Sequence, residues 1–170
     1  MEALSAAQKS AYYAGTVPPA EQIRDGIYVI PLPMTGSSLP FSLCYAIEDS
    51  RGEVHLVDSG VDTDAAWQAF ESGLAEYGHQ IDDVASLTAT HMHHDHFGLA
   101  SRLRRSSGAQ IRMHQRDAYV QAWLREELDE MLVTWGVPAP VRTQLAPALA
   151  SIFHRAVDRG CSASLPGVWC

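Results

Sequence analysis

The residues best suited to do chemistry in this chain are the histidines between positions 91 and 96. Four of the eight histidines in the sequence lie in this segment, together with Asp95. Side chains two residues apart in an extended chain point the same way, so His91 and His93 can bind one metal ion. Asp95 and His96 come where the chain turns into a helix, and we expect them to face a neighbouring position. Imidazole suits zinc and iron and a carboxylate adds negative charge, so the segment predicts a metal site. The alternative is a solvated histidine-rich loop without a metal.

The elements around this segment indicate an α/β fold. Residues 84–90 form a short apolar run typical of a buried strand, and residues 99–105 are typical of a helix that runs to Gly108. A loop that leaves a strand and enters a helix is where α/β folds place their active sites. The other expected elements are a helix at 3–14, a strand at 23–30, a loop at 31–40, a hairpin of 41–48 and 53–58, a helix capped by Asp62 or Thr63 and running to 77, a strand at 109–114, and two helices separated by a break at 136–140.

These elements divide the chain into four predicted regions. Residues 1–20 form an N-terminal helical extension, and residues 21–118 form the α/β core that carries the metal segment. Residues 119–158 form a helical insertion or cap, and residues 159–170 form an irregular tail. Strands alternate with helices only in the second region, so we expect the fold and the site to lie there.

Residues 90–96, with the sequence Thr-His-Met-His-His-Asp-His, resemble the T-H-x-H-x-D-H signature of the metallo-β-lactamase-fold metallohydrolases. Two flanking segments are similar to that family as well. Residues 56–60 look like its first motif, a strand that ends in an aspartate, here Asp58, and residues 99–118 look like its next helix and strand. The resemblance covers residues 23–118 and implies the family's αββα sandwich.

The resemblance implies a hydrolytic metal centre. His91 and His93 would help to hold a first ion. Asp95 and His96 would help to hold a second. The family implies zinc most often, as one or two ions, with iron or manganese in some branches. Water activated by the metal would attack an ester, lactone, thioester or amide bond of a small-molecule substrate, because a bound metal lowers the pKa of water from about 15.7 to about 7. Asp95 would also be the catalytic residue that accepts a hydrogen bond from this water and orients it.

Two further residues are predicted to orient the metal ligands without binding the metal themselves. Asp58 would fix a ligand or the loop that carries it. The alternative for Asp58 is a turn-forming aspartate at the end of a strand. His114 ends the strand that follows the metal segment. We expect it either to orient a metal ligand or to be a strand-end histidine without a role at the metal.

The second half of the family pattern has no counterpart that we can match in residues 119–170. The family's later histidine motif, its bridging aspartate, its last histidine and its remaining strands are all unmatched there. We therefore expect a truncated chain that holds the N-terminal half of the sandwich plus a helical segment. Each metal would then have two ligands from the motif, whereas catalytic zinc sites normally have three protein ligands. The alternative function is a catalytically silent metal-binding remnant or an interaction module, and a further option is a site completed by dimerisation.

Length, composition and charge are those of one acidic domain. The 170 residues are 46% hydrophobic and carry a formal net charge of −8, which disfavours contact with nucleic acid phosphates. No apolar run approaches the ~18 residues of a membrane span, and the N-terminus has no leader pattern, so we expect a cytoplasmic protein without membrane contact. An open sheet edge left by the missing half would favour association, so we also expect a homo-oligomer.

Overall fold

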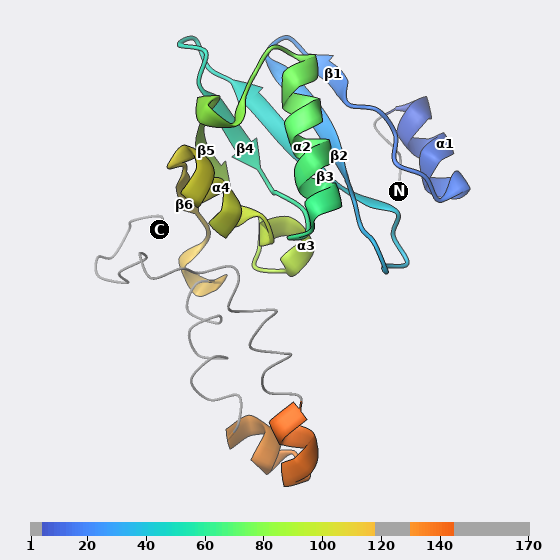
Figure 1. Ribbon diagram of the computed structural model, residues 1–170, viewed down its shortest axis with the longest axis vertical. Coiled ribbons are helices and arrows are strands. Elements are labelled where there is room, and N and C mark those ends of the chain that lie inside the picture. Colours follow the sequence, from blue (N-terminus) through green and yellow to red (C-terminus); the bar gives the residue numbers. More distant parts are fainter. Residues whose placement is uncertain (1–4, 118–129, 145–170) are drawn as a thin grey trace.

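The computed structural model describes residues 5–117 and 130–144, and its main feature is one mixed six-stranded sheet (Figure 1). The strands lie side by side in chain order: β1 (Glu21–Arg24), β2 (Ile27–Pro33), β3 (Phe41–Glu48), β4 (Val54–Val57), β5 (Val84–Thr88) and β6 (Gln110–Arg112). The pairs β1–β2, β2–β3 and β3–β4 are antiparallel, whereas the pairs β4–β5 and β5–β6 are parallel. Helices join the parallel strands, because such a connection must cross back over the sheet.

The helices begin and end close to their predicted positions. They are α1 (Ala6–Ala14), α2 (Asp64–Glu76), α3 (His94–Phe97) and α4 (Ala100–Ser107), with a 3₁₀ turn, η1 (Ile81–Asp83), before β5. Helix α2 begins after Thr63, whose Oγ1 accepts a hydrogen bond from the backbone N–H of Ala66 at 3.1 Å. This contact satisfies one of the free N–H groups of the first turn, as N-cap threonines do.

Helix α2 lies across one face of the sheet (Figure 1) and packs closely on β2. Gly73 makes this approach possible, because a β-carbon there would clash with the side chain of Ile30. Phe70 and Leu74 of α2 are each 1% exposed and belong to the same core as Ile30. Burial of each such side chain contributes roughly 1.5–3 kcal/mol, so the contact between α2 and β2 is a main stabilising contact of the sheet.

The other face of the sheet is only partly covered. Along β3, Cys44 and Ala46 are buried in the core, whereas Tyr45 between them is half-buried and Ile47 is 37% exposed. This alternation is expected when helices cover one face of a sheet and leave the other open. Within residues 5–117 and 130–144 the structure has this one sheet and its helices. The predicted α/β class is therefore confirmed.

Strand β2 continues further than the sequence pattern predicts. The pattern predicts a loop at residues 31–40, yet Pro31 and Pro33 belong to β2 and pair with β3. Strand β1 pairs with β2 only as far as Val29. Beyond Val29 that edge of β2 has no partner strand among the described residues, so the two prolines, which lack an N–H group, can face it without losing a sheet hydrogen bond.

The predicted polar loop at residues 91–96 is partly helical. His94 begins the short helix α3, and the backbone N–H of Phe97 donates to the carbonyl oxygen of His93 at 3.0 Å. The chain therefore turns into a helix at His94, within the segment that the sequence pattern predicts as a loop.

Residues 130–134 and 139–144 are helical on either side of the predicted break. The second helix begins earlier than its expected start at Val141, because Pro138 already supplies the carbonyl oxygen to which the Val141 N–H donates at 2.9 Å. The rest of the predicted cap at 119–158 and the tail at 159–170 lie outside the described residues. In the described part of the chain no helix combines the length and apolar character needed to span a bilayer.

Candidate metal centre

The histidine segment lies where the parallel strands β4 and β5 end. Asp58 follows β4, and its backbone N–H donates to the carbonyl oxygen of Thr88 on β5 at 3.0 Å. Ser59 donates its backbone N–H to the carbonyl oxygen of His96 at 2.8 Å. The loop after β4 and the loop after β5 are thus hydrogen-bonded to each other at the carboxyl ends of these strands, which is the position that the sequence pattern predicts for the site.

Asp58 is the residue that holds the segment together. Its side chain is buried, and its Oδ1 accepts the backbone N–H of Thr90 at 2.7 Å. Its Oδ2 lies 2.8 Å from Nδ1 of His96, and the Thr90 hydroxyl donates to the same carboxylate at 2.9 Å. Asp58 also has φ of 60°, a left-handed conformation that costs roughly 1–3 kcal/mol in a residue with a side chain. Hydrogen bonds to a charged group contribute roughly 1.5–3 kcal/mol each, and they offset this strain.

The Asp58 carboxylate also determines which ring nitrogens are free to bind a metal. Because a carboxylate only accepts, Nδ1 of His96 must carry the proton that is donated to Asp58, and Nε2 of the neutral ring then has a lone pair. The Thr90 hydroxyl uses its one proton on Asp58, so it accepts from Nδ1 of His91, which lies 3.0 Å away. Nε2 of His91 is then also left with a lone pair. One buried carboxylate therefore orients two histidines, one directly and one through Thr90.

The ring nitrogens that carry lone pairs each lie close to a second possible metal ligand atom, and this gives two donor pairs. Nε2 of His91 is 3.0 Å from Nδ1 of His93, and Nε2 of His96 is 3.4 Å from Oδ2 of Asp95. Two ligand atoms on one tetrahedral zinc ion are about 3.3–3.6 Å apart, given bonds of about 2.0–2.2 Å. The rings of His91 and His96 are also neighbours, with centroids 4.0 Å apart. The chemistry of this donor set fits divalent cations such as zinc, and the 3.4 Å between His96 and Asp95 matches the spacing of two ligands on one ion.

The family of this chain follows from comparison with known proteins. A family model described as the metallo-beta-lactamase superfamily matches residues 38–159. The chain belongs to the metallo-beta-lactamase superfamily. The resemblance carried by the motif at residues 90–96 is thereby confirmed.

Solved structures of the metallo-beta-lactamase superfamily resemble this chain. A metallo-beta-lactamase family protein from Thermus thermophilus is 32% identical, with a TM-score of 0.50, and the match covers 64% of this chain and 39% of that one. BJP-1, a subclass B3 metallo-beta-lactamase of Bradyrhizobium japonicum, is 20% identical, with a TM-score of 0.51, and the match covers 69% of this chain and 39% of that one. This chain thus matches less than half the length of either structure. No curated protein matches it significantly.

Gly98 sets how closely the metal segment of this metallo-beta-lactamase superfamily chain approaches the loop after β4. A β-carbon at Gly98 would lie 2.6 Å from the carbonyl oxygen of Gly60 and 2.7 Å from the backbone nitrogen of Asp62. Real β-carbons do not approach other atoms so closely, so only glycine allows this contact. The residue after the motif therefore has a steric role in positioning it.

His94 and His114 are the two histidines near the motif that the donor pairs do not include. His94 is exposed on α3, at a position that the sequence pattern leaves without a role. His114 is exposed after β6, and its Nδ1 accepts the backbone N–H of Arg116 at 3.3 Å. The supporting role predicted for His114 stays a prediction.

Cys44 is a packing residue next to this site. Burial raises the pKa of the Cys44 thiol above its ordinary value, and the negative charge of Asp58 raises it further. The thiol therefore stays protonated at neutral pH, and a protonated thiol is a poor metal ligand.

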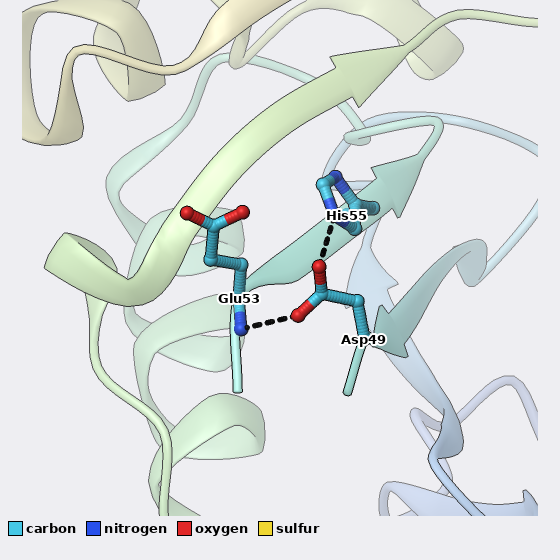
Figure 2. A group of neighbouring side chains, drawn as sticks. All are labelled: Asp49, Glu53 and His55. Atoms are coloured by element: carbon cyan, nitrogen blue, oxygen red, sulfur yellow. Dashed lines mark hydrogen bonds and ion pairs between the residues drawn. The ribbon is translucent and has the colours of Figure 1, made fainter. Parts of the chain in front are cut away.

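The sequence pattern missed a second group of metal-ligand side chains. Among residues 5–117 and 130–144, the three side chains of Asp49, Glu53 and His55 offer ligand atoms that all lie within 4.8 Å of one another (Figure 2). They lie at the turn between β3 and β4, whereas Asp58 follows the other end of β4. The sequence signal that was available is the alternation of Glu53 and His55 beside a turn aspartate.

Proposed function

We propose that this chain is a metal-dependent hydrolase that acts on an ester, lactone, thioester or amide bond of a small molecule. The observation that carries the proposal is the hydrogen-bond network of Asp58, which leaves a lone pair for metal binding on Nε2 of His91 and on Nε2 of His96. A network that fixes two ring nitrogens at once suits metal ligation better than it suits a solvated loop. We propose zinc, as one or two ions, with iron or manganese as the other metals that these ligands suit.

The residues of the motif would bind the metal ions and orient the attacking water. His91 and His93 would hold one ion, and His96 with Asp95 would hold a neighbouring one. A divalent ion at these positions would supply Lewis acidity and lower the pKa of water. Asp95 is half-buried, and its carboxylate would accept a hydrogen bond from the attacking water and orient it. Asp58 and Thr90 would keep the two histidines in the required tautomers throughout.

A second function is favoured by the number of ligands. Each donor pair supplies two protein atoms, and a catalytic zinc site normally uses three. We therefore keep a metal-binding module without turnover as the alternative. Such a module would bind zinc through the same residues but would hydrolyse nothing.

The experiment that separates these functions pairs metal analysis with a substrate panel. Purified wild-type protein, His93→Ala and His94→Ala are loaded with zinc, dialysed, and analysed for bound metal. His94→Ala is the matched control, because it removes an exposed imidazole of the same segment that is not in a donor pair. We expect zinc loss in His93→Ala alone. Equal zinc in all three proteins would refute the metal site.

Hydrolysis of lactones, thioesters, esters and β-lactams by the zinc-loaded protein then tests turnover. The proposal expects activity with at least one class and its loss in Asp95→Ala. Zinc bound at the motif without activity on any class would support the silent module.

The wider setting of the chain is part of the same proposal. We propose a cytoplasmic protein with a small-molecule substrate and no nucleic acid or membrane partner, as its formal net charge of −8 favours. Strands β1 and β6 are the edges of the sheet in the described residues, and three of the four residues of β1 are exposed. An exposed edge can pair with a second copy, which supports the homo-oligomer.

A further inference from the structure

The turn between β3 and β4 gathers a histidine and two carboxylates at the end of β4 away from the histidine motif. Figure 2 shows the Asp49 carboxylate between the backbone nitrogen of Glu53 and the ring of His55. The Asp49 and His55 side chains are 24% and 32% exposed, and that of Glu53 is 46% exposed. The ligand atoms can therefore be reached from solvent, and they are close enough together to share one ion.

The turn itself holds Asp49 in place. Its Oδ1 accepts the backbone N–H groups of Arg51 at 2.8 Å and of Glu53 at 3.0 Å. Its own backbone N–H donates to the carbonyl oxygen of Glu53 at 2.9 Å. The N–H of Arg51 is the largest factor that lowers the pKa of the Asp49 carboxyl to about 2. Asp49 is therefore ionised at neutral pH, and its Oδ2 faces away from these backbone donors and toward the group.

A buried serine orients the histidine of the group. Nδ1 of His55 lies 2.9 Å from Oγ of Ser86, which is 2% exposed on the neighbouring strand β5. Nε2 of His55 points the other way and lies 3.7 Å from Oδ2 of Asp49. This separation is close to the ~3.4 Å between two ligands on one tetrahedral zinc ion. A hydrogen bond to the far nitrogen of a ligand histidine is the usual way in which proteins fix its ring.

Arg51 occupies the position of a cation in this group. Its Nε lies 3.1 Å from Oδ2 of Asp49, and its terminal nitrogen lies 2.7 Å from Oε2 of Glu53. The Arg51 side chain is 71% exposed, and an exposed ion pair contributes only about 0–1 kcal/mol. A divalent ion carries twice the charge of a guanidinium and can also bond to the neutral ring of His55. An ion can therefore displace Arg51 at little cost.

We propose that Asp49, Glu53 and His55 form a divalent-cation site of the zinc class, distinct from the histidine motif, in which the ion replaces Arg51. One imidazole and two carboxylates suit zinc, whereas calcium takes oxygen ligands. The ion would tie the turn to β4 and, through Ser86, to β5. Its role is structural, because an ion that binds only the folded chain stabilises it by RT ln(1 + [L]/Kd), which increases with the ion's free concentration.

The experiment uses the full chain with the motif disabled by His91→Ala, His93→Ala and Asp95→Asn together. Zinc is titrated into this background by calorimetry, and its Tm is measured with and without zinc. Three variants are then added separately to the background: Glu53→Gln, His55→Gln and Arg51→Met. Glu71→Gln, which removes an exposed carboxylate of α2, is the matched control. Circular dichroism checks that each protein is folded.

The proposal expects the background protein to bind zinc and to gain thermal stability from it. Glu53→Gln and His55→Gln should each weaken this binding at least tenfold, and Glu71→Gln should leave it unchanged. Arg51→Met should strengthen binding severalfold, a change that misfolding cannot imitate. Zinc binding that ignores Glu53 and His55, weaker binding in Arg51→Met, or tighter binding of calcium than of zinc would each overturn the proposal.

Discussion

Replacing Asp58 with asparagine is the most informative change at the metal centre, because the two side chains have the same shape. The backbone N–H of Thr90 donates to Oδ1 at 2.7 Å and can only donate, so the amide oxygen of an asparagine must take that position. The amide NH₂ group then faces Nδ1 of His96, which lies 2.8 Å from the present Oδ2. A donor at that place forces the ring to carry its proton on Nε2, the nitrogen that should bind the metal.

The size of the effect follows from this change of tautomer. Losing one hydrogen bond to a charged group costs about 1.5–3 kcal/mol. Substitutions of residues that hydrogen-bond to metal ligands typically weaken metal binding by about 10–100-fold, which corresponds to about 1.4–2.8 kcal/mol. The two estimates agree, so we expect Asp58→Asn to weaken zinc binding by about 10–100-fold.

The assay is a competitive zinc titration against a chromophoric chelator, with circular dichroism to confirm the fold. Asp62→Asn is the matched control, since it makes the same chemical change in the loop after β4, outside the hydrogen bonds of Asp58. Nitrogen NMR of the histidine rings in the zinc-free proteins reports the tautomer directly. An Asp58→Asn protein that binds zinc within about threefold of wild type, with His96 still protonated on Nδ1, would refute the reasoning.

Three further outcomes follow from single contacts. Gly98→Ala should destabilise the fold by about 1–3 kcal/mol, because the new β-carbon would lie 2.6 Å from the carbonyl oxygen of Gly60; an unchanged urea midpoint would contradict this close packing. Thr63→Ala should cost about 1 kcal/mol by removing the cap of α2; urea unfolding measures the loss, and Thr63→Ser should recover most of it. The pKa of Asp49 is lowered from 3.8 to about 2, chiefly by the N–H of Arg51. This carboxylate therefore stabilises the fold above about pH 4 and loses its effect as the pH falls toward 2. The Tm difference between wild type and Asp49→Asn should shrink over that interval, and a difference that stays constant would contradict the assignment.

The pairing of donors at the site could be predicted from local spacing alone. The structure places Nε2 of His91 beside Nδ1 of His93, and Nε2 of His96 beside the Asp95 carboxylate, as the extended-then-helical pattern indicates. The role of Thr90 could not be predicted in this way. Its hydroxyl acts only through Asp58, which lies 32 positions earlier in the chain, and the sequence does not state such a contact.

Non-local contacts also explain the other parts that the sequence pattern missed. His55 is a candidate ligand only because Ser86 on the neighbouring strand fixes its ring, and these two residues are 31 positions apart. Pro31 can lie in a strand because β1 ends its pairing at Val29, and local proline chemistry favours a loop instead. In each case the register of one strand beside another decides the outcome.

A zinc anomalous difference map from crystals of the zinc-loaded protein tests most directly whether the histidine motif binds the metal. If the motif binds zinc as proposed, a peak lies within about 2.0–2.2 Å of Nε2 of His91 and Nδ1 of His93, with Nδ1 of His96 still bonded to Asp58. A second peak beside Nε2 of His96 and Asp95 would correspond to a two-metal site. Crystals with zinc elsewhere but none at the motif, and with His91 still hydrogen-bonded to His93, would contradict the account.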